Sequence, residues 1–143
     1  MSETMRAWAL ESARSWLGTP YRHQGSAKGI GCDCLGLIRG IWRELRGVEP
    51  EEPGAYSTTW SLRSGPDRLM AAAERHLLPV DMSQALPGDV LLFRWRSGAP
   101  ATHCAIVDES GRIIHAYQGA SVVSTALPNS WRGRIAGAFR FPE

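Results

Sequence analysis

The chain passes from loop to helix at Gly31-Cys32-Asp33-Cys34-Leu35-Gly36-Leu37-Ile38, and this stretch organises the rest of the sequence. Turn-prone glycine and serine residues precede it, while apolar residues at helical spacing follow it, which predicts a helix over 33–46. Cys34 therefore falls in the first helical turn. There, unpaired N–H groups and the positive end of the helix dipole favour a thiolate, the nucleophilic form of cysteine.

Composition and charge limit the class of protein. The 143 residues suffice for one domain with a hydrophobic core, and we assign residues 1–143 to a single domain. A net charge of +2 with scattered arginines does not indicate a nucleic-acid partner. No apolar run approaches the ~20 residues of a membrane span, so we expect no membrane insertion.

The chain starts without a secretory signal, which predicts synthesis and folding in the cytoplasm. It contains three cysteines, an odd number, and two of them lie only two positions apart. Both facts argue against a disulfide scaffold and favour reduced thiols.

Helical patterns come first in the chain and strand patterns follow. Helices are predicted over 5–17, over 33–46 and from Pro66 onward, with an irregular surface segment over 47–65. Short runs rich in valine, isoleucine and aromatic residues predict strands over about 90–93, 102–108, 112–117, 121–126 and 134–141. This order indicates an α+β domain in which N-terminal helices pack on an antiparallel sheet of about five strands.

Two histidines, His103 and His115, fall in adjacent predicted strands. If 109–111 is a three-residue loop with Gly111 left-handed, Asp108 pairs with Arg112. His103 and His115 then become diagonal neighbours on one face, roughly 7 Å apart between backbones. A two-residue loop would instead place them on opposite faces, because side chains alternate along a strand.

These residues can form a thiol–imidazole–polar triad. We expect Cys34 to be the nucleophile, His103 the base that takes its proton, and His115 the residue that orients His103. Backbone N–H groups at the helix start, together with the Tyr21 hydroxyl, are candidate oxyanion donors. No metal or organic cofactor is needed for this chemistry.

Five motifs in a fixed order carry a resemblance to a known family. They are Gly18-Thr19-Pro20-Tyr21, Asp33-Cys34-Leu35-Gly36-Leu37, Pro87-Gly88-Asp89, His103 and His115-Ala116. With them, the chain resembles the NlpC/P60 cysteine peptidases, which cut peptide bonds in bacterial cell-wall stems, over nearly its whole length. The resemblance implies a papain-like fold and the same roles for Cys34, His103, His115 and Tyr21.

The resemblance also implies a substrate and a setting. The substrate is the peptide stem of peptidoglycan, cut at the bond that follows D-glutamate. Leu35 stands where serine is usual, and with the short chain it resembles the small members encoded with phage tails and gene transfer agents. Such a protein is carried by a phage-like tail or baseplate and opens the periplasmic cell wall for DNA entry.

Two other interpretations of the same residues remain open at this point. Cys32, Cys34, His103 and His115 could form a structural zinc site, although Cys-x-Cys is an unusual spacing for zinc. Alternatively, the chain could be a catalytically silent tail-assembly protein that keeps the peptidase fold. Cys104 is expected to point away from the face that carries His103, because neighbours in a strand alternate.

Overall fold

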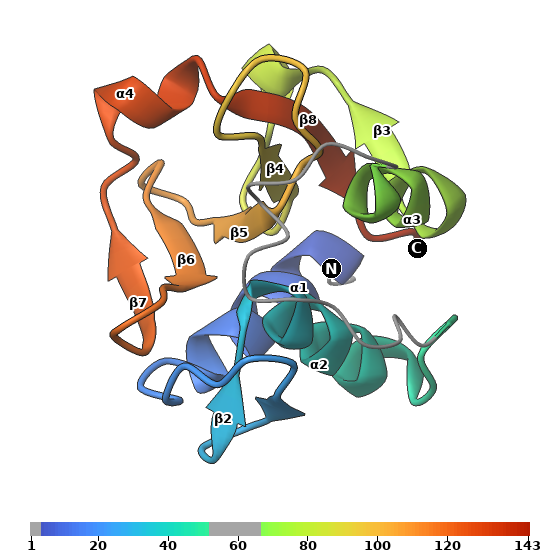
Figure 1. Cartoon of the computed structure of the whole chain (residues 1–143). Helices are drawn as coiled ribbons and strands as arrows, with labels where there is room; N and C mark the ends of the chain where they lie inside the picture. Colours follow the sequence, from blue (N-terminus) through green and yellow to red (C-terminus); the bar gives the residue numbers. More distant parts are fainter. Residues whose placement is uncertain (1–3, 52–66) are drawn as a thin grey trace.

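The computed structural model describes residues 4–51 and 67–143, which adopt an α+β architecture (Figure 1). Helices α1 (Met5–Ser15), α2 (Cys34–Arg46) and α3 (Arg68–His76) come before most of the sheet in the chain. Between α1 and α2 lies a small hairpin of β1 (Ser26–Ala27) and β2 (Gly31–Cys32). The predicted order of helices first and strands afterwards is confirmed.

The main sheet contains six strands in the spatial order β3-β8-β4-β5-β6-β7, and each neighbouring pair is antiparallel. A 3-10 turn η2 (Met82–Gln84) precedes β4, and a short helix α4 (Asn129–Arg132) joins β7 to β8. The strand bounds are β3 (Leu78–Val80), β4 (Val90–Phe93), β5 (His103–Val107), β6 (Ile113–Ala116), β7 (Val122–Thr125) and β8 (Ile135–Arg140). All five predicted strands are present.

The sixth strand, β3, was not predicted. It is three residues long, contains Pro79 and has an exposed Leu78, so it carries no alternating pattern. Its strand geometry comes from pairing with β8 at the edge of the sheet, where a proline is tolerated. The main sheet therefore consists of the five predicted strands and this additional edge strand.

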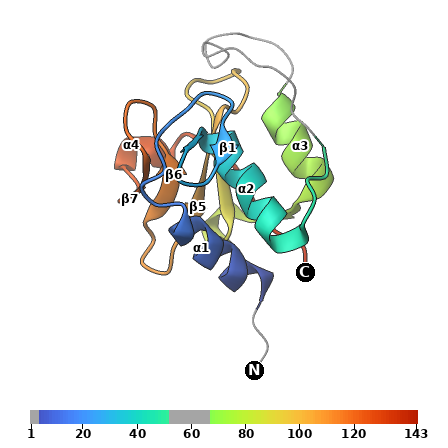
Figure 2. The same cartoon turned by 90° about the horizontal axis from the view of Figure 1, so that it is seen from below.

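Helices α1 and α2 lie side by side against one face of the sheet (Figures 1 and 2). Alternation along the strands divides the buried side chains between the two faces. One set packs with the helices and includes Leu92, Cys104, Ile106, Leu37 and Ile41. The other set includes Leu91, Phe93, Ala105 and Ile113, and the partly buried Trp131 of α4 packs against it. The main core thus lies between the sheet and the N-terminal helices.

The Pro-Gly-Asp motif joins α1 to the sheet. Gly88 has φ +92, and a Cβ there would lie 2.1 Å from the carbonyl oxygen of Arg6, so glycine is required. Asp89 is fully buried and accepts two hydrogen bonds of 2.9 Å from Arg140, which links β4 to β8. The glycine and the aspartate of the motif are therefore explained by packing, of Gly88 against α1 and of Asp89 against Arg140.

Part of the predicted surface segment 47–65, namely residues 52–65, lies outside the described residues, as does Pro66. Helix α3 begins at Arg68, and the Asp67 side chain accepts a hydrogen bond from the N–H of Met70 at 3.3 Å. Within the described ranges, no helix is both long and apolar enough to cross a membrane.

Candidate active site

Cys34 is the first residue of α2, as the sequence predicts. Asp33 caps the helix, with its Oδ1 accepting a hydrogen bond of 2.8 Å from the N–H of Gly36. The other carboxylate oxygen, Oδ2, accepts from the N–H of Gln24 at 2.7 Å and so ties the preceding loop to the helix start. The Asp-Cys pair therefore combines a capping residue with a thiol at the positive end of the helix.

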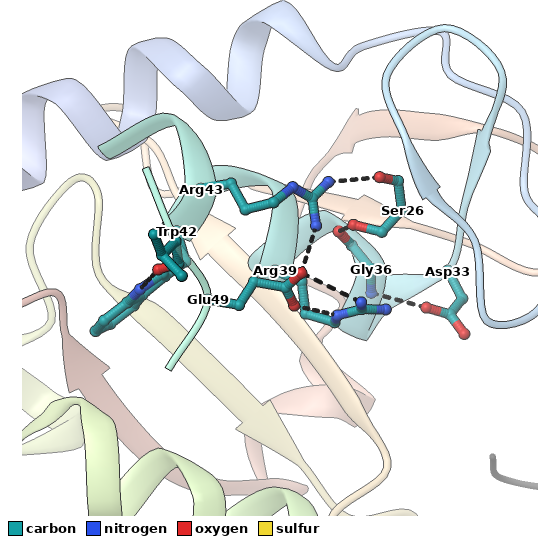
Figure 3. A network of polar contacts seen from close by, with 8 residues as sticks. Ser26, Asp33, Gly36, Arg39, Trp42, Arg43 and Glu49 are labelled. Atoms are coloured by element: carbon teal, nitrogen blue, oxygen red, sulfur yellow. Dashed lines mark hydrogen bonds and ion pairs between the residues drawn. The ribbon is translucent and has the colours of Figure 1, made fainter. Parts of the chain in front are cut away.

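The loop before Cys34 packs tightly on the first turns of α2 (Figure 3). A Cβ at Gly36 would lie 1.7 Å from the carbonyl oxygen of Gly25, so only glycine allows this approach. Ser26 donates a hydrogen bond of 2.7 Å to the carbonyl oxygen of Gly36, and Arg43 donates one of 2.5 Å to the carbonyl oxygen of Ser26. These contacts hold the backbone around Cys34 in place.

The β5–β6 turn has the predicted three-residue form. Gly111 has φ +79, and the N–H of Asp108 donates to the carbonyl oxygen of Arg112 at 2.9 Å. The register pairs Ile106 with Ile114, which places His103 and His115 diagonally on one face. The prediction that both histidines share a face is confirmed.

The two imidazoles are directly hydrogen-bonded. His103 Nε2 lies 2.9 Å from His115 Nδ1, and His115 Nε2 lies 3.0 Å from the hydroxyl oxygen of Thr125 on β7. Burial and the nearby His103 lower the pKa of His115 to about 4. His115 is therefore a neutral ring at neutral pH.

Cys34 is the acidic thiol of the site. Its pKa is lowered to about 5, first by a hydrogen bond from Cys104 and then by the hydrogen bond and charge of His103, against the opposing effect of burial. Its side chain is 8% exposed. At neutral pH, Cys34 is therefore a thiolate in contact with the His103 ring.

The other two cysteines stay protonated. Burial, followed by the charges of Asp33 and Cys34, raises the pKa of Cys32 to about 12. The hydrogen bond to Cys34, followed by burial, raises the pKa of Cys104 well above its ordinary value. Cys104 faces α2 and donates to the carbonyl oxygen of Cys34 at 3.2 Å, on the side of the sheet away from His103, as expected.

Tyr21 lies close to Cys34, in a parallel bridge with Cys32. Burial, and then the charges of Asp33, Cys34 and Cys32, raise its pKa to about 12. The hydroxyl therefore keeps its proton at neutral pH and can donate a hydrogen bond to a developing oxyanion.

Aromatic rings surround the histidine pair. Trp131 of α4 packs edge-on against both imidazoles, with centroids 5.7 Å from His103 and 5.6 Å from His115. The Trp95 ring lies 5.7 Å from that of His103 and 4.9 Å from that of Trp131. These rings limit rotation of the imidazoles and exclude water from around them.

The geometry does not favour the zinc alternative. A shared ion would need the nitrogens of His103 and His115 to point toward it, yet these nitrogens point at each other. Among the described residues, no group of three or more His, Cys, Asp or Glu side chains is placed to hold a metal ion.

Two contacts of the site were missed in the sequence. Cys104 was expected only to point away from the face of His103, which is correct, but its contact with Cys34 on the helix-facing side was not predicted. Thr125 was not considered, although its position two residues after the partner of His115 follows from the β6–β7 pairing. The contact could not be predicted because the sequence does not reveal the register in which β6 pairs with β7.

An acidic thiol at a helix start, beside a hydrogen-bonded imidazole pair on an α+β fold, is the arrangement of the cysteine peptidases. The sequence model of the NlpC/P60 family matches residues 18–140. The chain therefore belongs to the NlpC/P60 family, whose members include cysteine peptidases that act as peptidoglycan endopeptidases.

Curated relatives match over nearly the whole chain. The probable endopeptidase NlpC of Escherichia coli K12 is 27% identical over 90% of this chain and 72% of its own length. The murein DD-endopeptidase MepH of the same organism and the gamma-DL-glutamyl hydrolase of Bacillus subtilis 168 are each 25% identical over 92% of this chain. The chain spans only 44% and 28% of these two proteins.

Solved structures share the fold. The NlpC/P60 domain of the peptidoglycan hydrolase SagA superposes with a TM-score of 0.63 at 25% identity, covering 95% of this chain and 98% of that domain. An NlpC/P60 family protein from Bacillus cereus ATCC 10987 gives a TM-score of 0.69 at 24% identity, covering 95% of this chain and 40% of that one. The papain-like NlpC/P60 fold expected from the sequence is thus confirmed.

Proposed function

We propose that this chain hydrolyses amide bonds in the stem peptides of peptidoglycan through a thioester on Cys34. The observation that carries the proposal is the position of Cys34 at the start of α2 beside His103 and Cys104, whose hydrogen bonds lower the pKa of the Cys34 thiol. His103 is in turn held by His115 at 2.9 Å. A ready thiolate with an oriented proton donor is what amide cleavage requires.

The proposed reaction has two halves. The Cys34 sulfur attacks the carbonyl carbon of the stem amide, and backbone N–H groups at the start of α2, with the Tyr21 hydroxyl, stabilise the oxyanion. His103 gives its proton to the leaving amine, and the C–N bond breaks to leave a thioester. His103 then accepts a proton from water, whose oxygen displaces the sulfur and releases the carboxylate product.

The bond that we propose is the amide following D-glutamate, as the family resemblance implies. The names of the relatives point to more than one specificity, because one is a DD-endopeptidase and another a gamma-DL-glutamyl hydrolase. Each name describes only the protein that bears it. Product masses from defined stem peptides distinguish the two bonds directly.

The test is incubation of the reduced protein with defined muropeptides, wild type against Cys34→Ala, read by mass spectrometry. We expect the wild type to release two fragments whose masses sum to that of the substrate plus one water. Cys34→Ala should lose at least about a hundredfold in rate, because the nucleophile is removed.

Circular dichroism serves as the control that both proteins are folded. A wild type as inert as Cys34→Ala would overturn the proposal and favour a catalytically silent protein. Unchanged cleavage by Cys34→Ala would reject the assigned nucleophile.

We further propose that the protein is carried on a phage-like tail and acts on the periplasmic cell wall. The support is the resemblance to small tail-associated and gene-transfer-agent peptidases, including Leu35 in the motif around Cys34. Purified particles should contain the chain by quantitative mass spectrometry, and particles with Cys34→Ala should assemble but deliver DNA poorly. Its absence from particles would reject this setting.

A further inference from the structure

Thr125 occupies the outer end of a chain of hydrogen bonds that begins at the nucleophile. In the β6–β7 pairing, His115 lies opposite Val123, so Thr125 is its diagonal neighbour on the same face. The Thr125 hydroxyl oxygen lies 3.0 Å from His115 Nε2, while His115 Nδ1 lies 2.9 Å from His103 Nε2. Both nitrogens of His115 thus have a defined partner.

A neutral imidazole carries one proton and has one nitrogen free to accept a hydrogen bond. His115 is such a ring, because burial and the nearby His103 lower its pKa to about 4. It is therefore in one of two tautomers, and the two differ in whether Nδ1, the nitrogen that faces His103, accepts a hydrogen bond or carries the proton. A residue that favours one tautomer of His115 therefore affects the proton on His103.

The proposed reaction works with only one of these tautomers. His103 uses one ring nitrogen for Cys34 and the other, Nε2, for His115. Because one ring nitrogen of His103 exchanges its proton with Cys34 and with the leaving amine, the other nitrogen, Nε2, must keep its proton throughout and donate it to His115 Nδ1. His115 must then carry its proton on Nε2, where the Thr125 oxygen is the acceptor.

We infer that Thr125 is a positioning residue, whose hydroxyl oxygen accepts the Nε2 proton of His115 and thereby keeps the Nδ1 lone pair of His115 directed at His103. The inference rests on the proposed function for its catalytic consequence, but the tautomer itself can be measured without turnover. Thr125 acts through His115 and touches neither the substrate nor Cys34.

The surroundings make this contact effective. His115 is only 2% exposed, and Trp131 and Tyr117 pack on its ring with centroids 5.6 Å away in both cases. Rotation of the ring to seek another acceptor is therefore restricted. Without the threonine oxygen, a proton on Nε2 would be left in a largely apolar environment, which favours moving it to Nδ1.

The matched variants are Thr125→Val, which keeps the shape but removes the oxygen, and Thr125→Ser, which keeps the oxygen. Ser124→Ala is the control, because Ser124 is the adjacent residue of the same strand and faces the other way, toward Arg112. Nitrogen-15 NMR of labelled histidine identifies the protonated nitrogen of His115. Thermal unfolding verifies that each variant is folded.

In the NMR measurement, we expect the Nε2–H tautomer in the wild type, Thr125→Ser and Ser124→Ala. Thr125→Val should show a mixed or reversed tautomer. In kinetics with the cleaved muropeptide, Thr125→Val should lose about tenfold in kcat with little change in KM, the rate equivalent of one neutral hydrogen bond. Thr125→Ser should retain most of the activity.

The possible results distinguish the role of Thr125 from the proposed peptidase function. An unchanged tautomer and rate in Thr125→Val would overturn the role of Thr125. Equal losses in Thr125→Val and Thr125→Ser would also overturn it, since packing rather than the oxygen would then be the cause. A tautomer change in Thr125→Val alongside an inert wild type would support Thr125 as the residue that sets the tautomer while rejecting the proposed peptidase function.

Discussion

The pKa of Cys34 is lowered, whereas those of Cys32 and Cys104 are raised. The difference arises because Cys34 accepts hydrogen bonds from Cys104 and His103. The S–H of Cys104 has two acceptors within reach, the Cys34 carbonyl oxygen at 3.2 Å and the Cys34 sulfur. An anionic sulfur is the stronger acceptor, so Cys104 stabilises the thiolate while its own pKa rises. A buried cysteine thus acts as a hydrogen-bond donor to its neighbour.

At the scale of one residue, we predict that Cys104→Ala raises the pKa of Cys34 from about 5 toward its ordinary value. The loss of a donor to a charged sulfur corresponds to about one unit. The rate of alkylation by iodoacetamide, measured against pH with the modified cysteine identified by mass spectrometry, reports this change. The wild-type rate should fall as the pH is lowered through about 5, because the thiolate becomes protonated there.

Cys32→Ala is the matched control for this measurement, because Cys32 does not contribute to the lowered pKa of Cys34. It should leave the alkylation profile in place. An unshifted profile in Cys104→Ala would show that His103 and the helix start are enough to make the thiolate.

At the scale of the element, the β5–β6 hairpin decides whether the histidines meet. Asp108 Oδ1 accepts from the backbone N–H groups of Ser110 and Arg112, each at 2.9 Å, and Gly111 takes the left-handed conformation. These contacts select a three-residue loop. A loop one residue shorter would turn His115 to the opposite face of the sheet.

For the hairpin, we predict that Gly111→Val lowers the free energy of unfolding by about 1–2 kcal/mol, because a β-branched residue is strained at positive φ. A Cβ at this position meets no atom within 4 Å. The expected loss of stability therefore comes from backbone strain and not from a steric clash. Urea unfolding measures the change. Gly111→Asn is the control and should cost less, since asparagine tolerates this conformation; equal costs would contradict the strain explanation.

At the scale of the whole molecule, the Asp89–Arg140 pair connects elements that are distant in the chain. Asp89 is fully buried at the start of β4, and both of its oxygens accept from Arg140 near the end of β8 at 2.9 Å. Charged, hydrogen-bonded pairs of this kind are costly to break, because the remaining buried charge has no partner. This pair helps to hold β8 beside β4.

For the whole fold, we predict that Arg140→Met lowers the free energy of unfolding by about 3–5 kcal/mol, since it leaves the buried Asp89 carboxylate without an opposite charge and with only the N–H of Leu86, at 2.8 Å, as a donor. Urea unfolding followed by circular dichroism measures the loss. Glu109→Gln, which breaks the exposed Arg14–Glu109 pair, is the control and should cost less than about 1 kcal/mol. Similar small losses in both variants would mean that the Asp89 site rehydrates easily.

Much of the fold and of the candidate site follows from local patterns. The cap at Asp33, the helix start at Cys34 and the turn at Gly111 each depend on residues within a few positions in the chain. The five predicted strands are likewise visible as short apolar runs. Strand β3 was missed because its geometry depends on pairing with β8, about sixty positions later.

The sequence by itself determined the order of elements, the position of Cys34 at a helix start and the shared face of His103 and His115. Helix capping, strand alternation and turn geometry are short-range properties, so they can be derived from neighbouring residues. Only the tertiary structure decided that Cys104 donates to Cys34 and that Thr125 contacts His115. These contacts arise where separate elements pack, because strand order and register bring together side chains that the local sequence does not relate.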